Sequence, residues 1–249
     1  MRTLLTYLVL LSYTVVLGIT VIVASMLGVR YRPGNIMDRA PRWWARALLR
    51  AAGVTVEFHD LERSQTGEPH IFVSNHVSWF DVLALAAWLP RYKFVAKAEL
   101  TKIPIFGKGM LAVGTVAIER ENRKSAFASY EKAAETIRGG DNVVVYPEGT
   151  RGTTYALRPF KKGPFVLAIA AQVPIVPTIV HGTIEINPRG SYRVHRAGTI
   201  HVHFLEPVPT AGMTYDDRDA LAQRVYDRMA EAMERLYQVR SPRSATRAA

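Results

Sequence analysis

The 249-residue chain contains no cysteine. Disulfide bridges, thiolate metal sites, iron–sulfur clusters and a cysteine nucleophile are therefore excluded, and any chemistry must use other side chains. Acidic residues are also scarce: 21 Asp and Glu stand against 32 Lys and Arg, which gives a net charge of +11. Such a balance is typical of proteins that meet nucleic acid, an anionic membrane surface or an anionic substrate. The length suits one large domain or two small ones with a buried core.

The surplus of positive charge lies at the two ends of the chain. Residues 1–59, 60–150 and 151–249 have net charges of +5, 0 and +6. Charged residues are absent from Leu4 to Val29, a run of 26 positions. A helix of that length measures about 39 Å, more than the roughly 30 Å hydrocarbon core of a bilayer. The run is also longer than the about 7–15 apolar residues of a secretory signal peptide, so we expect a membrane segment.

Arginines follow this apolar run and hardly precede it. Only Arg2 lies before it, whereas six arginines follow within about 20 residues, with Asp38 as the one nearby acid. The positive-inside rule then places the body of the chain on the cytoplasmic side of a cell membrane. Gly18, between Thr14 and Thr20, leaves open whether the segment is a spanning helix or a helical hairpin seated in one leaflet.

Residues 42–52 form a second stretch suited to a membrane surface. On a helix, three arginines spaced four residues apart fall within an arc of about 80°, and Trp43 and Trp44 lie on the opposite side. Such a helix fits the headgroup boundary, and a soluble helix whose tryptophans pack on the domain is the alternative. We expect residues 1–52 to form a membrane anchor with an interfacial amphipathic helix.

The rest of the chain alternates short apolar runs, rich in β-branched residues, with helical stretches. Several runs have no polar position, as expected for strands buried on both faces. The alternation predicts an α/β fold with a mostly parallel central sheet flanked by helices over residues 53–239. The tail 240–249 has no apolar residue other than alanine, which predicts disorder. The expected strands are 54–58, 71–74, 92–96, 115–118, 143–146, 175–180 and 199–205, and the expected helices are 79–89, 123–138, 163–172 and 216–237.

A histidine and an aspartate follow the second expected strand. His76 lies at the strand end, where active sites of open α/β sheets gather. Asp81 is five residues further on, so it reaches the imidazole only across a strand-to-helix turn, which the region of Ser78 supplies. In that geometry the carboxylate fixes the tautomer, and the other ring nitrogen removes a proton from a hydroxyl. A structural histidine is the alternative.

A second polar segment, Val145 to Arg151, follows another apolar strand. Gly149 permits close backbone approach, and the guanidinium of Arg151 offers a planar fork for phosphate oxygens. Glu148 is suited to hold that fork or an acceptor hydroxyl. An ordinary turn with an ion pair is the alternative. Together, the two segments describe a base beside an anion site.

Four blocks resemble those of the glycerolipid (lysophospholipid) acyltransferase family, of the 1-acylglycerol-3-phosphate acyltransferase type. The first is the family's Asn-His-x-x-x-x-Asp motif, and the blocks occur in the family's order and spacing over residues 70–180. The departures are mild: Glu119 replaces Asp, Tyr146 replaces Phe and Gly152 replaces Ser. The blocks are Asn75-His76 with Asp81, Ile118–Arg120, Tyr146–Gly152 and Val173–Pro177.

The resemblance implies a membrane-bound acyltransferase that makes phosphatidate from lysophosphatidate in phospholipid synthesis. By analogy, His76 oriented by Asp81 would deprotonate the acceptor hydroxyl, which would attack the thioester of acyl-CoA or acyl carrier protein with no acyl-enzyme. Arginines and lysines of the other blocks would hold the acceptor phosphate beside the imidazole. The implied substrate-binding residues are Lys97, Arg120, Glu148, Gly149, Thr150 and Arg151.

Neither a cofactor nor a metal ion is predicted. His201 and His203 alternate along one strand, but no carboxylate or third histidine accompanies them at ligand spacing. The sequence also has no Gly-x-Ser-x-Gly and no P-loop motif, which argues against an α/β-hydrolase and a P-loop enzyme.

Two alternatives to this function remain open. The same chemistry would serve glycerol 3-phosphate, another lysophospholipid or a lyso-aminolipid. A non-catalytic lipid-binding or nucleic-acid-binding protein belongs to another class. Against nucleic acid, aromatic residues do not alternate with a Lys/Arg stripe except at Trp43 and Trp44, which lie beside the apolar run. The expected partners are therefore membrane lipids, a lysophospholipid acceptor and the acyl-CoA or acyl carrier protein donor, with no nucleic acid.

Overall fold

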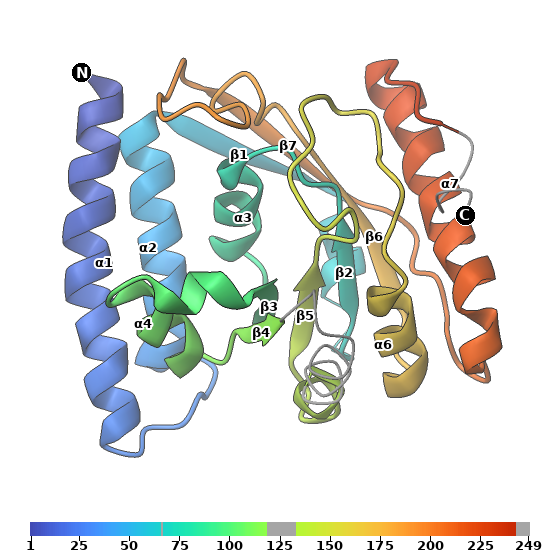
Figure 1. The fold of residues 1–249 in the computed structure, drawn as a ribbon, viewed down its shortest axis with the longest axis horizontal. Coiled ribbons are helices and arrows are strands. Elements are labelled where there is room, and N and C mark those ends of the chain that lie inside the picture. The colour runs from blue at the N-terminus through green and yellow to red at the C-terminus, as the bar shows by residue number, and fades with distance from the viewer. Residues whose placement is uncertain (66, 119–132, 243–249) are drawn as a thin grey trace.

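The computed structural model describes residues 1–65, 67–118 and 133–242 (Figure 1). Within these residues a seven-stranded sheet lies between helices, in the order β1-β7-β6-β2-β5-β3-β4. Neighbouring strands are parallel except for β6 and β7, which are antiparallel. The predicted α/β class with a mostly parallel sheet is confirmed. The strands are β1 (Val54–His59), β2 (Ile71–Ser74), β3 (Tyr92–Lys97), β4 (Val116–Ile118), β5 (Asn142–Val145), β6 (Ile175–His181) and β7 (Gly198–Phe204).

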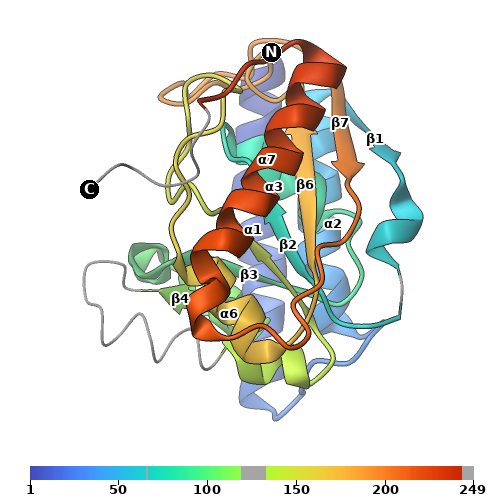
Figure 2. The same ribbon diagram turned by 90° about the vertical axis from the view of Figure 1, so that its right-hand side faces the viewer.

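Helices cover both faces of the sheet. Helices α6 and α7 lie on one face, toward the viewer in Figure 2, and α2 and α3 lie on the other. Successive residues of a strand point to opposite faces, so β2 supplies Ile71 and Val73 to one core and Phe72 to the second. This explains why its sequence is apolar throughout. The α-helices are α1 (Arg2–Met26), α2 (Ile36–Ala52), α3 (Trp79–Ala86), α4 (Phe106–Ala112), α6 (Gly163–Ala171) and α7 (Arg218–Tyr237), with 3₁₀ turns at Leu61–Ser64, Ala98–Lys102 and Tyr215–Asp217.

The apolar run near the N-terminus forms one continuous helix, α1. Among the described residues it is the helix long and apolar enough to cross a membrane, and almost none of its most apolar window is buried inside the protein. It packs side by side with α2, as Figure 1 shows, so the two form a helical hairpin. Thr14 accepts a hydrogen bond of 2.9 Å from the indole of Trp44. Gly18 lies against Ile105, where a Cβ atom would collide with that side chain, so glycine allows α4 to approach α1 closely.

The two tryptophans of helix α2, which the sequence predicts on one surface, lie in different surroundings. Trp44 packs on Phe106 of α4, as the soluble-helix alternative describes, whereas Trp43 stays exposed. Arg46 donates to the carbonyl of Ala87 and stacks on the Trp88 ring at 4.3 Å, so it is part of the packing against α3. The interfacial role of this helix stays a prediction.

Most expected elements occur within a residue or two of their expected bounds. Of the expected helix 123–138, residues 133–138 are helical, and the positions up to 132 lie outside the described residues. Two differences stand out. Helix α4 was not expected. The expected disordered tail is held in place over its first three residues: Ser241 accepts a hydrogen bond from the amide of Leu157, and Pro242 accepts one from the hydroxyl of Tyr226. Positions 243–249 lie outside the described residues.

Candidate active site

The imidazole of His76 and the carboxylate of Asp81 are in contact. His76 follows β2, and Asp81 lies in the first turn of α3. The distance from His76 Nδ1 to Asp81 Oδ2 is 2.9 Å. The chain turns between them at Val77 and Ser78, as the spacing of five residues required. The predicted pair is therefore formed.

Asp81 is fully buried, and three of its polar neighbours donate hydrogen bonds to it. Its Oδ2 accepts hydrogen bonds from the amides of Val77 (2.7 Å) and Ser78 (2.8 Å), and its Oδ1 accepts one from the hydroxyl of Thr183 (2.6 Å). The bond to the Ser78 amide belongs to a capping box that starts α3. A carboxylate in this position is suited to accept a fourth hydrogen bond, from Nδ1 of His76. Nε2 of His76 is left as the basic nitrogen.

The backbone that carries His76 is fixed on both sides. The buried side chain of Asn75 bridges to β6, donating to the carbonyl of Val180 (2.9 Å) and accepting from its amide (2.8 Å). On the other side, the amide of Gly152 donates to the carbonyl of His76 (2.7 Å). The ring of Tyr146 stacks on the imidazole with 4.0 Å between the centroids. These contacts leave the His76 ring little freedom to turn.

Glu148 is buried behind the site and supports it. Its Oε1 accepts a hydrogen bond of 3.0 Å from the backbone amide of His76. Burial raises the pKa of Glu148 to about 7, against the opposing effects of that amide and of Arg158. The sequence predicts that this carboxylate holds the guanidinium of Arg151 or an acceptor hydroxyl. In this structure it contacts the backbone of the His76 turn and supports the position of His76, and its contact with the substrate stays a prediction.

A cavity of about 380 Å³ opens at His76. Its wall is mostly apolar and comes from α1, α2, α3, α4 and all six residues of β3. The β3 side chains extend it over about 16 Å, from Lys97 at the His76 end to Tyr92 at the other. Helix α1 contributes Leu17, Gly18 and Val21, so the hairpin is part of the cavity wall.

The end of the cavity remote from His76 is polar, which the sequence did not predict. The buried Lys93 ammonium lies 3.2 Å from the centre of the Tyr31 ring and donates to the carbonyl of Val113 (2.9 Å). Burial lowers the pKa of Lys93 to about 8, although the nearby Asp141 opposes the shift. The hydroxyl of Tyr31 donates to Asp38 (2.9 Å). These residues come from separate segments, so no sequence motif marks them.

Positive charge lies at the His76 end of the cavity. Arg151, Gly149 and Thr150 line it with His76, and Lys97 lies at the same end of β3. The guanidinium of Arg151 stacks on the ring of Trp79 at 5.0 Å. Partial burial, with repulsion from Arg189, lowers the pKa of Arg151, but an arginine stays charged. Of the predicted site residues, Arg120 lies outside the described residues.

Sequence reasoning missed the supporting residues of this site. Three features depend on contacts between distant segments. They are the bridge from Asn75 to β6, the hydrogen bond from Thr183 to Asp81 and the polar end of the cavity at Lys93. Thr183 lies two residues after the carboxyl end of β6, and this position was the one feature of the sequence that could have indicated its place in the site.

Comparisons with known proteins identify the family of the chain. The acyltransferase family model matches residues 55–181. The human 1-acyl-sn-glycerol-3-phosphate acyltransferase beta is 34% identical over 83% of this chain and 76% of its own length, and the human alpha enzyme is 37% identical over 70% and 62%. A crystal structure of the 1-acyl-sn-glycerophosphate (LPA) acyltransferase PlsC from Thermotoga maritima matches with a TM-score of 0.75 and 25% identity, covering 92% of this chain and 94% of that one. The chain therefore belongs to the acyltransferase family of enzymes.

Proposed function

We propose that this acyltransferase moves a fatty acyl group from a thioester to the free hydroxyl of lysophosphatidate, giving phosphatidate. The observation that carries the proposal is the His76–Asp81 pair at the opening of an apolar cavity, with Arg151 at the same opening. The names of the relatives support the choice of acceptor.

The proton transfer follows from the tautomer of His76. Because Asp81 holds the proton on Nδ1, Nε2 accepts the proton of the acceptor hydroxyl as its oxygen attacks the thioester carbonyl. The imidazolium that forms is stabilised by the adjacent carboxylate. The same imidazolium then returns the proton to the leaving thiolate, and the thioester bond is replaced by an ester bond.

Direct transfer without an acyl-enzyme is part of the proposal. The chain has no cysteine. Ser74 and Ser78, the hydroxyls nearest to His76 in the sequence, are both buried. Ser74 donates to the carbonyl of Asn75 (3.1 Å) and Ser78 to the carbonyl of Asn187 (2.6 Å), so both are engaged in structure. The acceptor hydroxyl is then the nucleophile itself.

The two substrates would use different parts of the cavity. The apolar walls fit the acyl chain of the donor, with the thioester at His76 and the chain running along β3 toward Tyr31 and Lys93. Arg151 and Lys97 offer positive charge for the acceptor phosphate, which would hold its hydroxyl near Nε2. Arg120 is proposed for the same role on sequence grounds alone.

Donor and location complete the proposal. Acyl-CoA and acyl carrier protein both present a thioester, and the reaction needs no further cofactor. The apolar face of α1 and the arginines that follow it favour a cell-membrane enzyme whose sheet domain lies on the cytoplasmic side.

The test measures acyl transfer by the full-length protein in detergent, with acyl-CoA and lysophosphatidate. Released CoA is followed with a thiol reagent, to which the cysteine-free enzyme adds no background. His76→Ala should lower the rate by at least about 10²-fold. His195→Ala, which changes an exposed histidine elsewhere, is the matched control and should keep the wild-type rate. Undiminished transfer by a folded His76→Ala protein would disprove the mechanism.

A panel of acceptors tests the acceptor and the phosphate site. With one acyl-CoA, we expect lysophosphatidate to react faster than glycerol 3-phosphate, lysophosphatidylcholine or a lyso-aminolipid. Arg151→Ala should raise the KM for lysophosphatidate about 10- to 100-fold, as expected when a hydrogen bond to a charged group worth about 1.5–3 kcal/mol is lost. A change confined to the KM of the donor would show that Arg151 does not hold the phosphate.

A further inference from the structure

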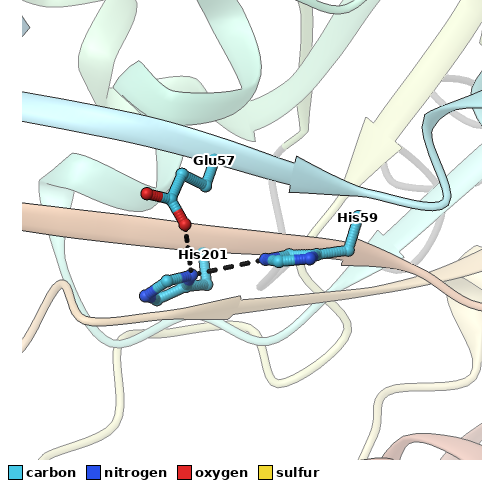
Figure 3. Close-up of side chains that lie close together, drawn as sticks. All are labelled: Glu57, His59 and His201. Atoms are coloured by element: carbon cyan, nitrogen blue, oxygen red, sulfur yellow. Dashed lines mark hydrogen bonds and ion pairs between the residues drawn. The ribbon is translucent and has the colours of Figure 1, made fainter.

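A group of metal-ligating side chains lies at the β1 edge of the sheet, away from the catalytic cavity. Strand β1 pairs in parallel with β7, with Glu57 opposite His201 and His59 opposite His203. Side chains two residues apart on a strand share a face, so all four lie on the face that α7 covers. Figure 3 shows the Glu57 carboxylate and the His59 ring both directed at the ring of His201.

Two of the separations match those of neighbouring ligand atoms around one ion. His201 Nδ1 lies 3.3 Å from His59 Nε2 and 3.4 Å from Glu57 Oε2. In a tetrahedral zinc site with bonds of about 2.0–2.1 Å, neighbouring ligand atoms lie about 3.3–3.4 Å apart. All three ligand atoms are within 4.8 Å of one another. With one proton, His201 Nδ1 can donate a hydrogen bond to only one of its two neighbours. A cation between the three atoms can be coordinated by all of them.

The surroundings hold the ligands and leave one side open. His203 stacks on the His59 ring, 4.1 Å between centroids and 9° from parallel, and its Nε2 lies 2.6 Å from the hydroxyl of Tyr237 in α7. The His203 ring, held by Tyr237, thereby fixes the orientation of the His59 ring. The side chain of Glu57 is 58% exposed, so an ion can enter and a water molecule can complete the coordination.

We propose that Glu57, His59 and His201 bind a divalent transition-metal ion of the zinc type. Two imidazoles and a carboxylate form a ligand set that zinc accepts, with water in the fourth position. None of the three residues lines the cavity at His76, so the ion would be structural. It would clamp edge strand β1, which continues directly from α2, to β7. The clamp would thereby strengthen the attachment of the N-terminal hairpin to the sheet.

The sequence prediction of no metal site considered one strand only. His201 and His203 have no further ligand nearby in the sequence, and the additional donors come from residues more than 140 positions away. The parallel pairing of β1 with β7 supplies them.

The test titrates zinc into the full-length, detergent-purified protein after tag removal and treatment with a chelator. Calorimetry should show one zinc ion per chain, and cobalt should give the visible absorption of a tetrahedral site. His59→Gln and His201→Gln should each weaken binding at least tenfold and reduce the zinc-induced rise in Tm. Glu57→Gln, a change at an exposed position, tests the carboxylate in a protein expected to fold normally.

His195→Gln is the matched control, because it removes a histidine outside the cluster and should leave zinc binding unchanged. Absence of zinc binding by the wild-type protein would overturn the proposal. So would equal affinity and stoichiometry in the wild type and both His59 and His201 variants.

Discussion

Replacing Asp81 by asparagine isolates the charge of the carboxylate from its shape. In Asp81→Asn the amide oxygen can keep the three acceptor contacts of Oδ2, to His76 Nδ1 and to the amides of Val77 and Ser78. The amide nitrogen then faces Thr183, whose hydroxyl can accept as well as donate. We therefore expect the variant to fold.

The expected loss of rate follows from the distance between the charges. Asp81 Oδ2 lies 2.9 Å from His76 Nδ1, which places the centres of charge about 4 Å apart when the imidazolium forms. At an effective dielectric constant of about 20, that attraction is worth about 4 kcal/mol. Because about 1.4 kcal/mol corresponds to a factor of ten, kcat should fall by about 10³-fold. The KM values should change little, since the charge develops only during the reaction.

Steady-state kinetics with both substrates varied, together with a thermal unfolding curve, test this prediction. Thr183→Val is the graded control: it removes one donor to Asp81 and leaves the contact with His76, so its kcat should fall by no more than about tenfold. A folded Asp81→Asn protein with kcat within tenfold of wild type would refute the reasoning. A loss that appeared only in KM would do the same.

Three further substitutions test the surroundings of His76. In Asn75→Ala the amide and carbonyl of Val180 lose their partner, so the free energy of unfolding should fall by about 2–5 kcal/mol in denaturant unfolding; an unchanged midpoint would contradict this. The Tyr146 hydroxyl is buried with no hydrogen-bond partner among the described residues, so Tyr146→Phe should keep activity and leave Tm equal or higher. A loss of kcat there would show that the hydroxyl has a chemical role. For Glu148, the folded-state pKa of about 7 lies above the ordinary 4.5, so the folded protein binds more protons and wild-type stability falls as pH rises between these values. The Tm of Glu148→Gln relative to wild type should therefore rise across that window and then level off, and a flat difference would place the pKa elsewhere.

The strands were predictable because burial on both faces leaves a strong pattern in the sequence. Runs such as Ile71–Ser74 read as apolar throughout, and β-branched residues identify them as strands. Helix α4 was not predictable, because its seven residues include Gly107 and Gly109, which disfavour helix. Close contact with α1 at Gly18 outweighs that propensity.

The site was predictable where its parts are close in the sequence. His76 and Asp81 are joined by a local turn, and the Gly149–Arg151 turn directly follows a strand. The contact of Glu148 with the His76 turn was not predictable, because its partner is a backbone amide, for which no residue type gives a signal. The contacts of Thr183 and the pairing of Glu57 with His201 arise only when distant strands come together.

The packing of α1 has a consequence for how this sequence can change. Its outer face carries exposed apolar side chains, and there one aliphatic residue can replace another with little effect. Its inner face, at Leu17, Gly18 and Val21, also forms a wall of the cavity that opens at His76. Helix α1 is thus not exchangeable for any apolar helix of the same length, because such a helix would supply the same hydropathy and a differently shaped cavity.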